Sequence, residues 1–180
     1  MNNRIILDNR LMQLTLERFS YQLLENYGDF SNTSIIGVQP RGVLLSDKIY
    51  ENLIKLTDHP IEYGKLDITF YRDDFRSKGK HLEAKETDIN FSLEGKRIIL
   101  IDDVLYTGRT IRAALDALLA HGRPSEVKLL TLINRRFSRE LPIQSDFTGK
   151  TVDTQLGEVV SVEWENEEFG SCVILLKEKI

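Results

Sequence analysis

Two adjacent carboxylates, Asp102 and Asp103, stand where the sequence pattern predicts the end of a buried strand. They follow four aliphatic residues, 98–101, a run typical of a strand that is buried on both faces of a parallel sheet. A turn of small and hydroxyl residues follows at 107–110, and apolar residues then recur with helical spacing at 111, 114, 115, 118 and 119. The predicted order is therefore strand, acid pair, tight loop and helix.

Each part of this block suits one chemical task. Backbone N–H groups at a helix start lack intrahelical partners and can hold a phosphate, and Gly108 allows close backbone approach. The hydroxyls of Thr107 and Thr110 add donors. Carboxylates at a strand's carboxyl end can accept hydrogen bonds from sugar hydroxyls or help to hold Mg²⁺. The block as a whole indicates a ribose 5-phosphate site, whereas an arbitrary Asp-Asp pair would favour two solvated acids in a turn.

A second strand–loop–helix junction lies earlier in the chain. Residues 34–38 predict a short buried strand, and Pro40, Arg41 and Gly42 follow before a helical pattern. A glycine and an arginine at a helix start can bind an anion. Taken alone, these three residues are as compatible with a plain turn as with an anion site. Because the acid pair is also present, we favour the anion site.

A long polar stretch separates these two junctions. Leu66, Ile68 and Phe70 alternate with polar residues and predict a strand with one polar face. Residues 72–90 are then mostly charged or polar and lack an apolar period. Because this stretch is longer than most internal connections, we favour a lid over substrate at about 71–90 rather than a plain loop.

The remaining pattern completes an α/β protein. Residues 127–133 predict another buried strand, which carries Asn134 and Arg135 at its carboxyl end. Residues 159–164 and 172–176 predict a hairpin, which we expect to build a small hood together with the N-terminal segment. The alternation of strands and helices predicts a twisted, mainly parallel sheet flanked by helices.

Composition limits the other possibilities. The 180 residues fit one domain, and the net charge of −4 gives no electrostatic footprint for DNA or RNA. The single cysteine, Cys172, excludes an internal disulfide, and three scattered histidines offer no zinc-ligand spacing. Neither a signal-peptide core nor a stretch of membrane-spanning length is present in the sequence, so we expect a cytoplasmic location without membrane contact.

Residues 99–110 resemble the phosphoribosyl-pyrophosphate (PRPP) motif of type I phosphoribosyltransferases. The version Val-Leu-Tyr-Thr-Gly-Arg-Thr at 104–110, followed by Arg112-Ala113, is similar to the PyrR family. That family comprises pyrimidine-operon regulators that also have uracil phosphoribosyltransferase activity. The likeness extends from about Ile6 to the C-terminus and is strongest between Asp67 and Lys150.

The resemblance implies a type I phosphoribosyltransferase fold and the reaction of uracil with PRPP to give UMP and diphosphate. It also implies sensing of UMP or UTP, a homodimer or larger homo-oligomer, and Mg²⁺ held mainly by substrate oxygens. In this interpretation Asp102 and Asp103 serve the ribose hydroxyls and the magnesium shell, and Arg41 and Arg72 neutralise the diphosphate. The implied nucleotide site also contains Pro40, Gly42, Val104, Leu105, Tyr106, Thr107, Gly108, Arg109, Thr110, Asn134, Arg135 and Val160.

Two departures keep alternatives open. Asn134 replaces the family's acid, and Arg136-Phe137-Ser138 departs from the usual Gly-His and is one residue longer, so another nucleobase is an alternative substrate. A second alternative is an RNA-binding attenuation regulator with a vestigial transferase site. The corresponding exposed candidates are not basic, which disfavours RNA binding: they are Glu17, Tyr21, Asn26 and Gln144. Four basic residues leave that question open: Arg18, Arg136, Arg139 and Lys150.

Overall fold

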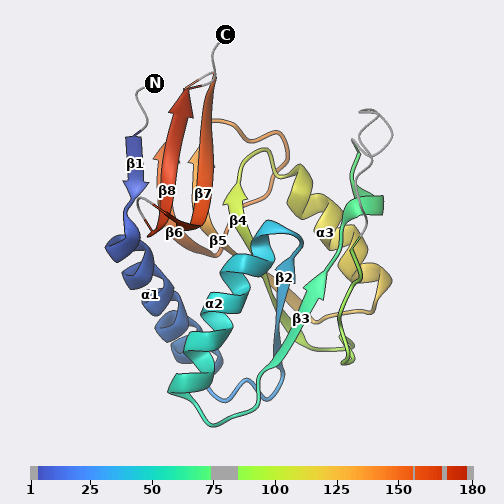
Figure 1. Ribbon diagram of the computed structural model, residues 1–180. Helices are drawn as coiled ribbons and strands as arrows, with labels where there is room; N and C mark the ends of the chain where they lie inside the picture. Colours follow the sequence, from blue (N-terminus) through green and yellow to red (C-terminus); the bar gives the residue numbers. More distant parts are fainter. Residues whose placement is uncertain (1–3, 74–84, 156, 168–169, 178–180) are drawn as a thin grey trace.

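A parallel five-stranded sheet forms the centre of the computed structural model, which describes residues 4–73, 85–155, 157–167 and 170–177 (Figure 1). The strand order is β3-β2-β4-β5-β6, and every neighbouring pair is parallel. The strands are β2 (Thr33–Val38), β3 (Glu62–Leu66), β4 (Arg97–Leu105), β5 (Glu126–Arg136) and β6 (Phe147–Asp153). Because their carboxyl ends meet at one edge, the groups that follow them can form a single site.

Helices cover both faces of this sheet. The helices α1 (Asn9–Tyr27) and α2 (Arg41–Leu56) pack on one face, and α3 (Arg109–Ala120) packs on the other (Figure 1). Strand β4 is buried on both sides, since Ile99 and Ile101 belong to the first core cluster while Ile98 and Leu100 belong to the second. The interpretation of residues 98–101 as a doubly buried strand is therefore confirmed.

A second, antiparallel sheet adjoins the carboxyl edge of the first. Its order is β1-β8-β7, from β1 (Arg4–Leu7), β8 (Gly170–Lys177) and β7 (Glu158–Asn166). We call this three-stranded sheet the hood. The predicted C-terminal hairpin and its pairing with the N-terminal segment are confirmed, and Cys172 is buried there with a free thiol.

The sequence predicts that Asp8 or Asn9 caps the first helix and that Gly28 stops it, and both ends of α1 are confirmed. The Asp8 carboxylate accepts a hydrogen bond of 2.8 Å from the Leu11 N–H, a side-chain cap for the first turn. Gly28 stops the helix with φ of +58°, a left-handed conformation that side chains disfavour. In the part of the chain that the structure describes, no helix is both long and apolar enough to span a membrane.

The predicted strand at 66–71 is wrong. Strand β3 ends at Leu66, and Thr69–Tyr71 form a 3₁₀ turn, η1. The Asp67 carboxylate accepts hydrogen bonds from the N–H and the hydroxyl of Thr69, at 3.3 and 2.7 Å. This local bonding competes with strand pairing, and Phe70 is left exposed.

The predicted apolar face of α3 is partly wrong. Leu119 is 57% exposed, whereas Ala113 and Ala117 are fully buried beside Ile111 and Leu118. Small alanine side chains let the helix lie close to the sheet. The buried face of α3 is therefore rotated away from Leu119, toward Ala113 and Ala117. The sequence also predicts that this helix ends at His121-Gly122, which is confirmed, since α3 ends at Ala120.

Candidate active site

Asp102 and Asp103 lie near the carboxyl end of β4, with only 5% and 6% of their surfaces exposed. The Asp103 N–H donates a hydrogen bond of 3.0 Å to Asp102 Oδ1. Burial raises the pKa of both carboxyls, and the neighbouring Asp103 charge raises the pKa of Asp102 further. Arg41 and Arg72 act in the opposite direction on the Asp102 pKa, but burial outweighs them. The two acids therefore form an electrostatically costly pair that hydroxyl donors or a cation would stabilise.

The start of α2 presses against this acid pair. A Cβ atom on Gly42 would lie 2.4 Å from the Ile101 carbonyl oxygen and 3.2 Å from Asp102 Oδ1. Only glycine fits so close an approach, which brings the predicted Pro40-Arg41-Gly42 turn against β4. The Gln39–Pro40 peptide is cis, and the charge of the exposed Arg41 partly offsets the rise that burial causes in the pKa of Asp103.

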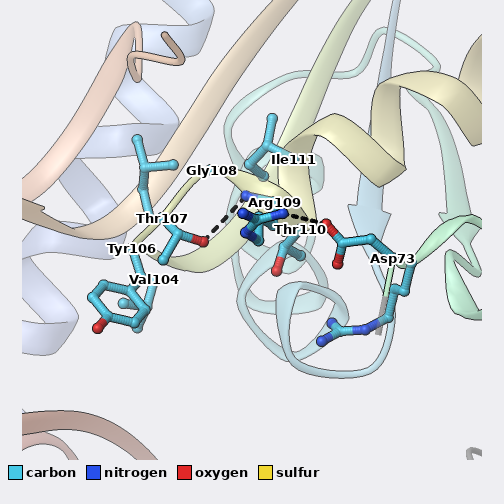
Figure 2. A pocket seen from close by; sticks show the side chains of 10 residues that line it. Asp73, Val104, Tyr106, Thr107, Gly108, Arg109, Thr110 and Ile111 are labelled. Atoms are coloured by element: carbon cyan, nitrogen blue, oxygen red, sulfur yellow. Dashed lines mark hydrogen bonds and ion pairs between the residues drawn. The ribbon is translucent and has the colours of Figure 1, made fainter. Parts of the chain in front are cut away.

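The loop between β4 and α3 lines a cavity of about 700 Å³ (Figure 2). Gly108 adopts φ of +92° immediately before the helix, and the Thr107 hydroxyl accepts a hydrogen bond of 3.3 Å from the Arg109 N–H. The first-turn N–H groups of α3 point to the same end of the helix, where they favour an anion. The lining residues are Arg72, Asp73, Val104, Leu105, Tyr106, Thr107, Gly108, Arg109, Thr110 and Ile111. The structure thus brings Arg72 to the predicted phosphate loop.

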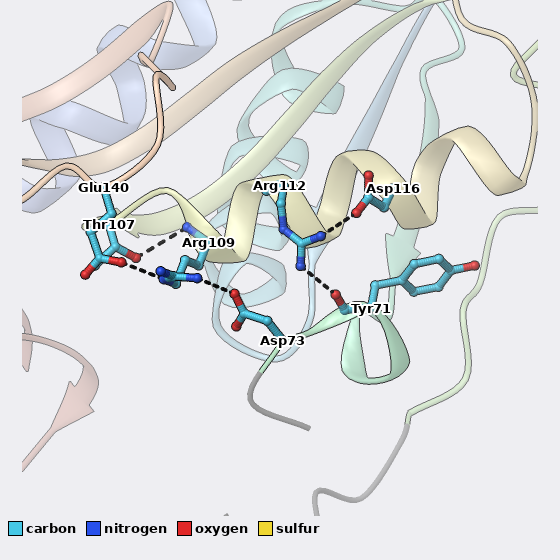
Figure 3. A network of polar contacts seen from close by, with 7 residues as sticks. All are labelled: Tyr71, Asp73, Thr107, Arg109, Arg112, Asp116 and Glu140. Carbon is cyan, nitrogen blue, oxygen red and sulfur yellow. Dashed lines mark hydrogen bonds and ion pairs between the residues drawn. The ribbon is translucent and has the colours of Figure 1, made fainter. Parts of the chain in front are cut away.

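Arg109 connects three segments that are distant in the sequence (Figure 3). Its guanidinium lies 2.5 Å from an Asp73 carboxylate oxygen and 2.6 Å from one of Glu140. These two acids raise its pKa, Glu140 the more. One turn further along α3, Arg112 binds the Tyr71 carbonyl at 3.0 Å. The first turns of α3 therefore hold the entry to the predicted lid, whose residues 74–84 lie outside the described part of the chain.

The segment after β5 supports the phosphate loop from outside. The backbone N–H groups of Glu140 and Leu141 donate to the Thr107 carbonyl at 3.0 and 3.1 Å. Arg139 donates to the Tyr106 carbonyl and, at 2.6 Å, to Asn134 Oδ1. The sequence alone did not indicate this supporting role, because the contacts join segments that are distant in the chain.

A second cavity of about 360 Å³ adjoins the first and shares Tyr106 with it. Arg135, 7% exposed, donates to Thr154 Oγ1 at 3.2 Å and to the Glu158 carbonyl at 2.8 Å. Its guanidinium carbon lies 3.8 Å from the Tyr106 ring centroid, and burial lowers its pKa. Val160, in contrast, is buried in the apolar core, so its placement adds no support for the predicted contact with a base.

The donor set suits a cation that brings most of its own ligands. In the described ranges, no three His, Cys, Asp or Glu side chains gather as a metal centre. The two adjacent carboxylates offer the hard oxygen atoms that Mg²⁺ prefers. They fit a magnesium ion that is shared with substrate oxygens rather than one held by the protein alone.

Together, the parallel sheet, the hood and the loop between β4 and α3 form a type I phosphoribosyltransferase fold. The sequence profile of the phosphoribosyl transferase domain matches residues 2–167, so the chain belongs to this family of phosphoribosyltransferases. Hypoxanthine phosphoribosyltransferase from Trypanosoma cruzi superposes with a TM-score of 0.71 at 14% identity, covering 96% of this chain and 91% of that one. A Staphylococcus aureus hypoxanthine phosphoribosyltransferase gives 0.64 at 18% identity, covering 87% and 80%. Identities this low support the fold alone.

Sequence relatives place the chain more narrowly. A Caldicellulosiruptor bescii protein is 43% identical, with 90% of each chain covered, and one from Geobacter sp. strain M21 is 39% identical, covering 98% of this chain and 99% of the relative. A Geobacter sulfurreducens protein is 41% identical, covering 96% and 97%. All three are named bifunctional protein PyrR, and within the phosphoribosyltransferases this chain belongs to the PyrR family.

Proposed function

We propose that the chain transfers the phosphoribosyl group of PRPP to uracil, giving UMP and diphosphate. The observation that carries the proposal is the acid pair of β4 lying between two helix starts, the Arg41-Gly42 turn on one side and the loop at 107–110 on the other. One junction suits the 5′-phosphate, the other suits the diphosphate, and the carboxylates between them suit the ribose. Membership of the PyrR family supports uracil as the base.

In this reaction the protein mainly positions and stabilises charge. The C1–oxygen bond to diphosphate breaks, the C1–N1 bond to uracil forms, and the N1 proton leaves to solvent. Asp102 and Asp103 would hold the ribose hydroxyls and stabilise positive charge developing on the ring. Arg41 and Arg72 would take the negative charge of the leaving group. Mg²⁺, when bound to substrate oxygens beside the acid pair, would supply further charge neutralisation.

The proposed transferase would be one domain of residues 1–180, with the hood over the base and a lid at about 71–90. The contacts of Glu86 and Asp88, which lie at the end of the proposed lid, support this arrangement. The Gln39 amide donates to the Glu86 carbonyl at 2.7 Å, and Lys65 and Asp88 exchange backbone hydrogen bonds of 2.8 Å. We further propose a homodimer or larger homo-oligomer, which light scattering would test.

RNA binding is a second candidate, because the resemblance to pyrimidine-operon regulators implies it and the relatives are named bifunctional. The four basic side chains that left it open are engaged within the chain. Arg18 binds the Gly149 carbonyl at 2.8 Å, Lys150 binds the Ile6 carbonyl at 2.9 Å, and Arg136 and Arg139 bind Asp153 and Asn134. Because phosphate contacts need available cations, we propose weak RNA regulation at most. Nanomolar, salt-dependent binding of a pyrimidine leader RNA in a filter titration would contradict this proposal.

The decisive experiment compares uracil, hypoxanthine and xanthine as substrates with PRPP and Mg²⁺. We expect product nucleotide with uracil and little with the two purines. Turnover of a purine in preference to uracil would replace the proposed substrate, and no turnover with any of the three would contradict the proposed transferase. The matched control omits Mg²⁺ and adds a chelator. In this proposal the ion binds together with substrate oxygens, so turnover should fall when it is removed.

A further inference from the structure

Phe137 is an exposed aromatic residue in an unfavourable backbone conformation. It adopts φ of +62°, in the left-handed region that bulky side chains rarely occupy, and 85% of its surface is exposed. Burial of the ring therefore does not compensate the cost of the conformation. A residue held this way points to a role that the folded chain alone does not explain.

One face of the Phe137 ring is braced. The Arg136 guanidinium carbon lies 5.4 Å from the ring centroid. Arg136 is in turn fixed by two hydrogen bonds to the Asp153 carboxylate, of 2.6 and 2.8 Å, from the end of β6. Such a bidentate pair holds the guanidinium plane in a defined orientation. The arrangement supports the ring from one side and leaves most of its surface to solvent.

The cavity beside Phe137 has the features of a binding site for a planar ring. It holds about 360 Å³ and is lined by Phe137, Tyr106, Arg135 and Arg139 among others. Tyr106 has its own arginine, Arg135, over one face, and its ring is directed away from Asp73 in the neighbouring cavity (Figure 2). Tyr106 and Phe137 both line this cavity, so each offers an aromatic surface on which a planar ring can stack.

We propose that Phe137 is a stacking residue for the nucleobase of the proposed reaction, bound in this cavity. The inference rests on the proposed function, because the shared residue Tyr106 joins this cavity to the phosphate cavity that would hold the ribose end. It assigns a role to the segment at 136–138, which is the part of the site that departs from the family pattern.

The test compares two ligands that differ only in the base. Calorimetric titrations measure the Kd of UMP and of ribose 5-phosphate for the whole chain and for Phe137→Asn, Phe137→Tyr and Tyr21→Asn. Asparagine tolerates the left-handed backbone but cannot stack as an aromatic ring does, so it separates the ring from the backbone. Tyr21, 55% exposed on α1, is the matched aromatic control away from the site.

We expect Phe137→Asn to weaken UMP binding by about tenfold, the order expected for loss of one base–aromatic stack, with ribose 5-phosphate unchanged. Phe137→Tyr should retain UMP affinity, and Tyr21→Asn should match the unaltered chain for both ligands. Equal UMP affinity in Phe137→Asn and the unaltered chain would overturn the inference. So would loss of leader-RNA binding in that variant with unchanged UMP affinity, because the ring would then serve RNA.

The two proposals fail differently in this experiment. If the unaltered chain binds neither UMP nor ribose 5-phosphate, the proposed function fails and the inference fails with it. If it binds ribose 5-phosphate and UMP equally well, the phosphate site stands and the base cavity is overturned. Thermal unfolding of Phe137→Asn provides an independent readout, because removing left-handed strain should raise its Tm. A lowered Tm would instead show that the ring is needed for folding and would count against the inference.

Discussion

Replacing Gly42 by alanine should damage the site more than it damages the fold. The added Cβ would lie 2.4 Å from the Ile101 carbonyl oxygen, about 1 Å closer than an ordinary contact. Since backbone atoms cannot swing aside, the start of α2 must move away from β4 by a comparable distance. A displacement of this size between two binding groups costs on the order of 100-fold in rate, whereas overpacking costs about 1–3 kcal/mol of stability.

The chain offers a matched control for this substitution. A Cβ on Gly149 would also lie 2.4 Å from a carbonyl oxygen, that of Leu132, but in the contact between β5 and β6. Steady-state kinetics with varied PRPP and thermal unfolding should be measured for Gly42→Ala and Gly149→Ala. We expect both to lose several degrees of Tm, at about 2–4 °C per kcal/mol, and only Gly42→Ala to lose about 100-fold in kcat/KM for PRPP.

The comparison can refute the reasoning in two ways. A Gly42→Ala protein with normal kcat/KM and lowered Tm would mean that the approach of α2 to Asp102 serves packing alone. Equal activity losses in Gly42→Ala and Gly149→Ala would mean that activity simply follows stability. In either case the Arg41-Gly42 turn could no longer be assigned to the leaving group.

Three further predictions concern the charged groups of the site. Asp103→Asn should lower kcat by about 10²-fold or more while its unfolding remains cooperative, and a normal turnover rate would contradict the role of the acid pair. Burial raises the pKa of Asp102 and Asp103 in the folded state, so the folded chain binds more protons than the unfolded chain. The free energy of unfolding without ligand should therefore fall as pH rises above the ordinary aspartate pKa of about 4. Urea unfolding across pH measures this decline, and Asp102→Asn should flatten it; a rise in stability over the same range would show that the acids are not desolvated. Arg109→Met should raise KM for PRPP with little change in Tm, since it loses exposed pairs with Asp73 and Glu140; an unchanged KM would mean that these pairs do not position the loop.

The parts of the fold that could be predicted from the sequence depend on local patterns. Residues 98–101 identified the central strand, because a strand buried on both faces needs apolar residues at every position. Asp8 and Gly28 marked the ends of α1, because capping chemistry is local to one turn. The acid pair and the loop at 107–110 were likewise adjacent in sequence, and the structure keeps them adjacent in space.

The parts that could not be predicted depend on competition or on distant contacts. At 66–70 the alternating pattern favoured a strand, but one Asp67–Thr69 turn bonded the backbone locally and ended β3. The same limit applies to Arg139, one of the four basic residues that left RNA binding open. Its partners, Asn134 and the Tyr106 carbonyl, meet only because β4 and β5 are neighbours in the sheet.

These distant contacts hold the proposed phosphate loop in one conformation before substrate arrives. Loop carbonyls at 106 and 107 accept hydrogen bonds from residues 139–141, and Arg109 ties the first turn of α3 to Glu140 and Asp73. The groups that would grip the phosphate are therefore fixed from outside the cavity rather than by contacts within it. Ordering a loop on binding costs conformational entropy. A loop that is already held in place avoids this cost, so more of its interaction energy contributes to the affinity for substrate. The segment after β5, which carries the proposed stacking residue Phe137, therefore also supports the proposed phosphate loop, so a substitution at residues 139–141 should weaken binding of both the base and the phosphate.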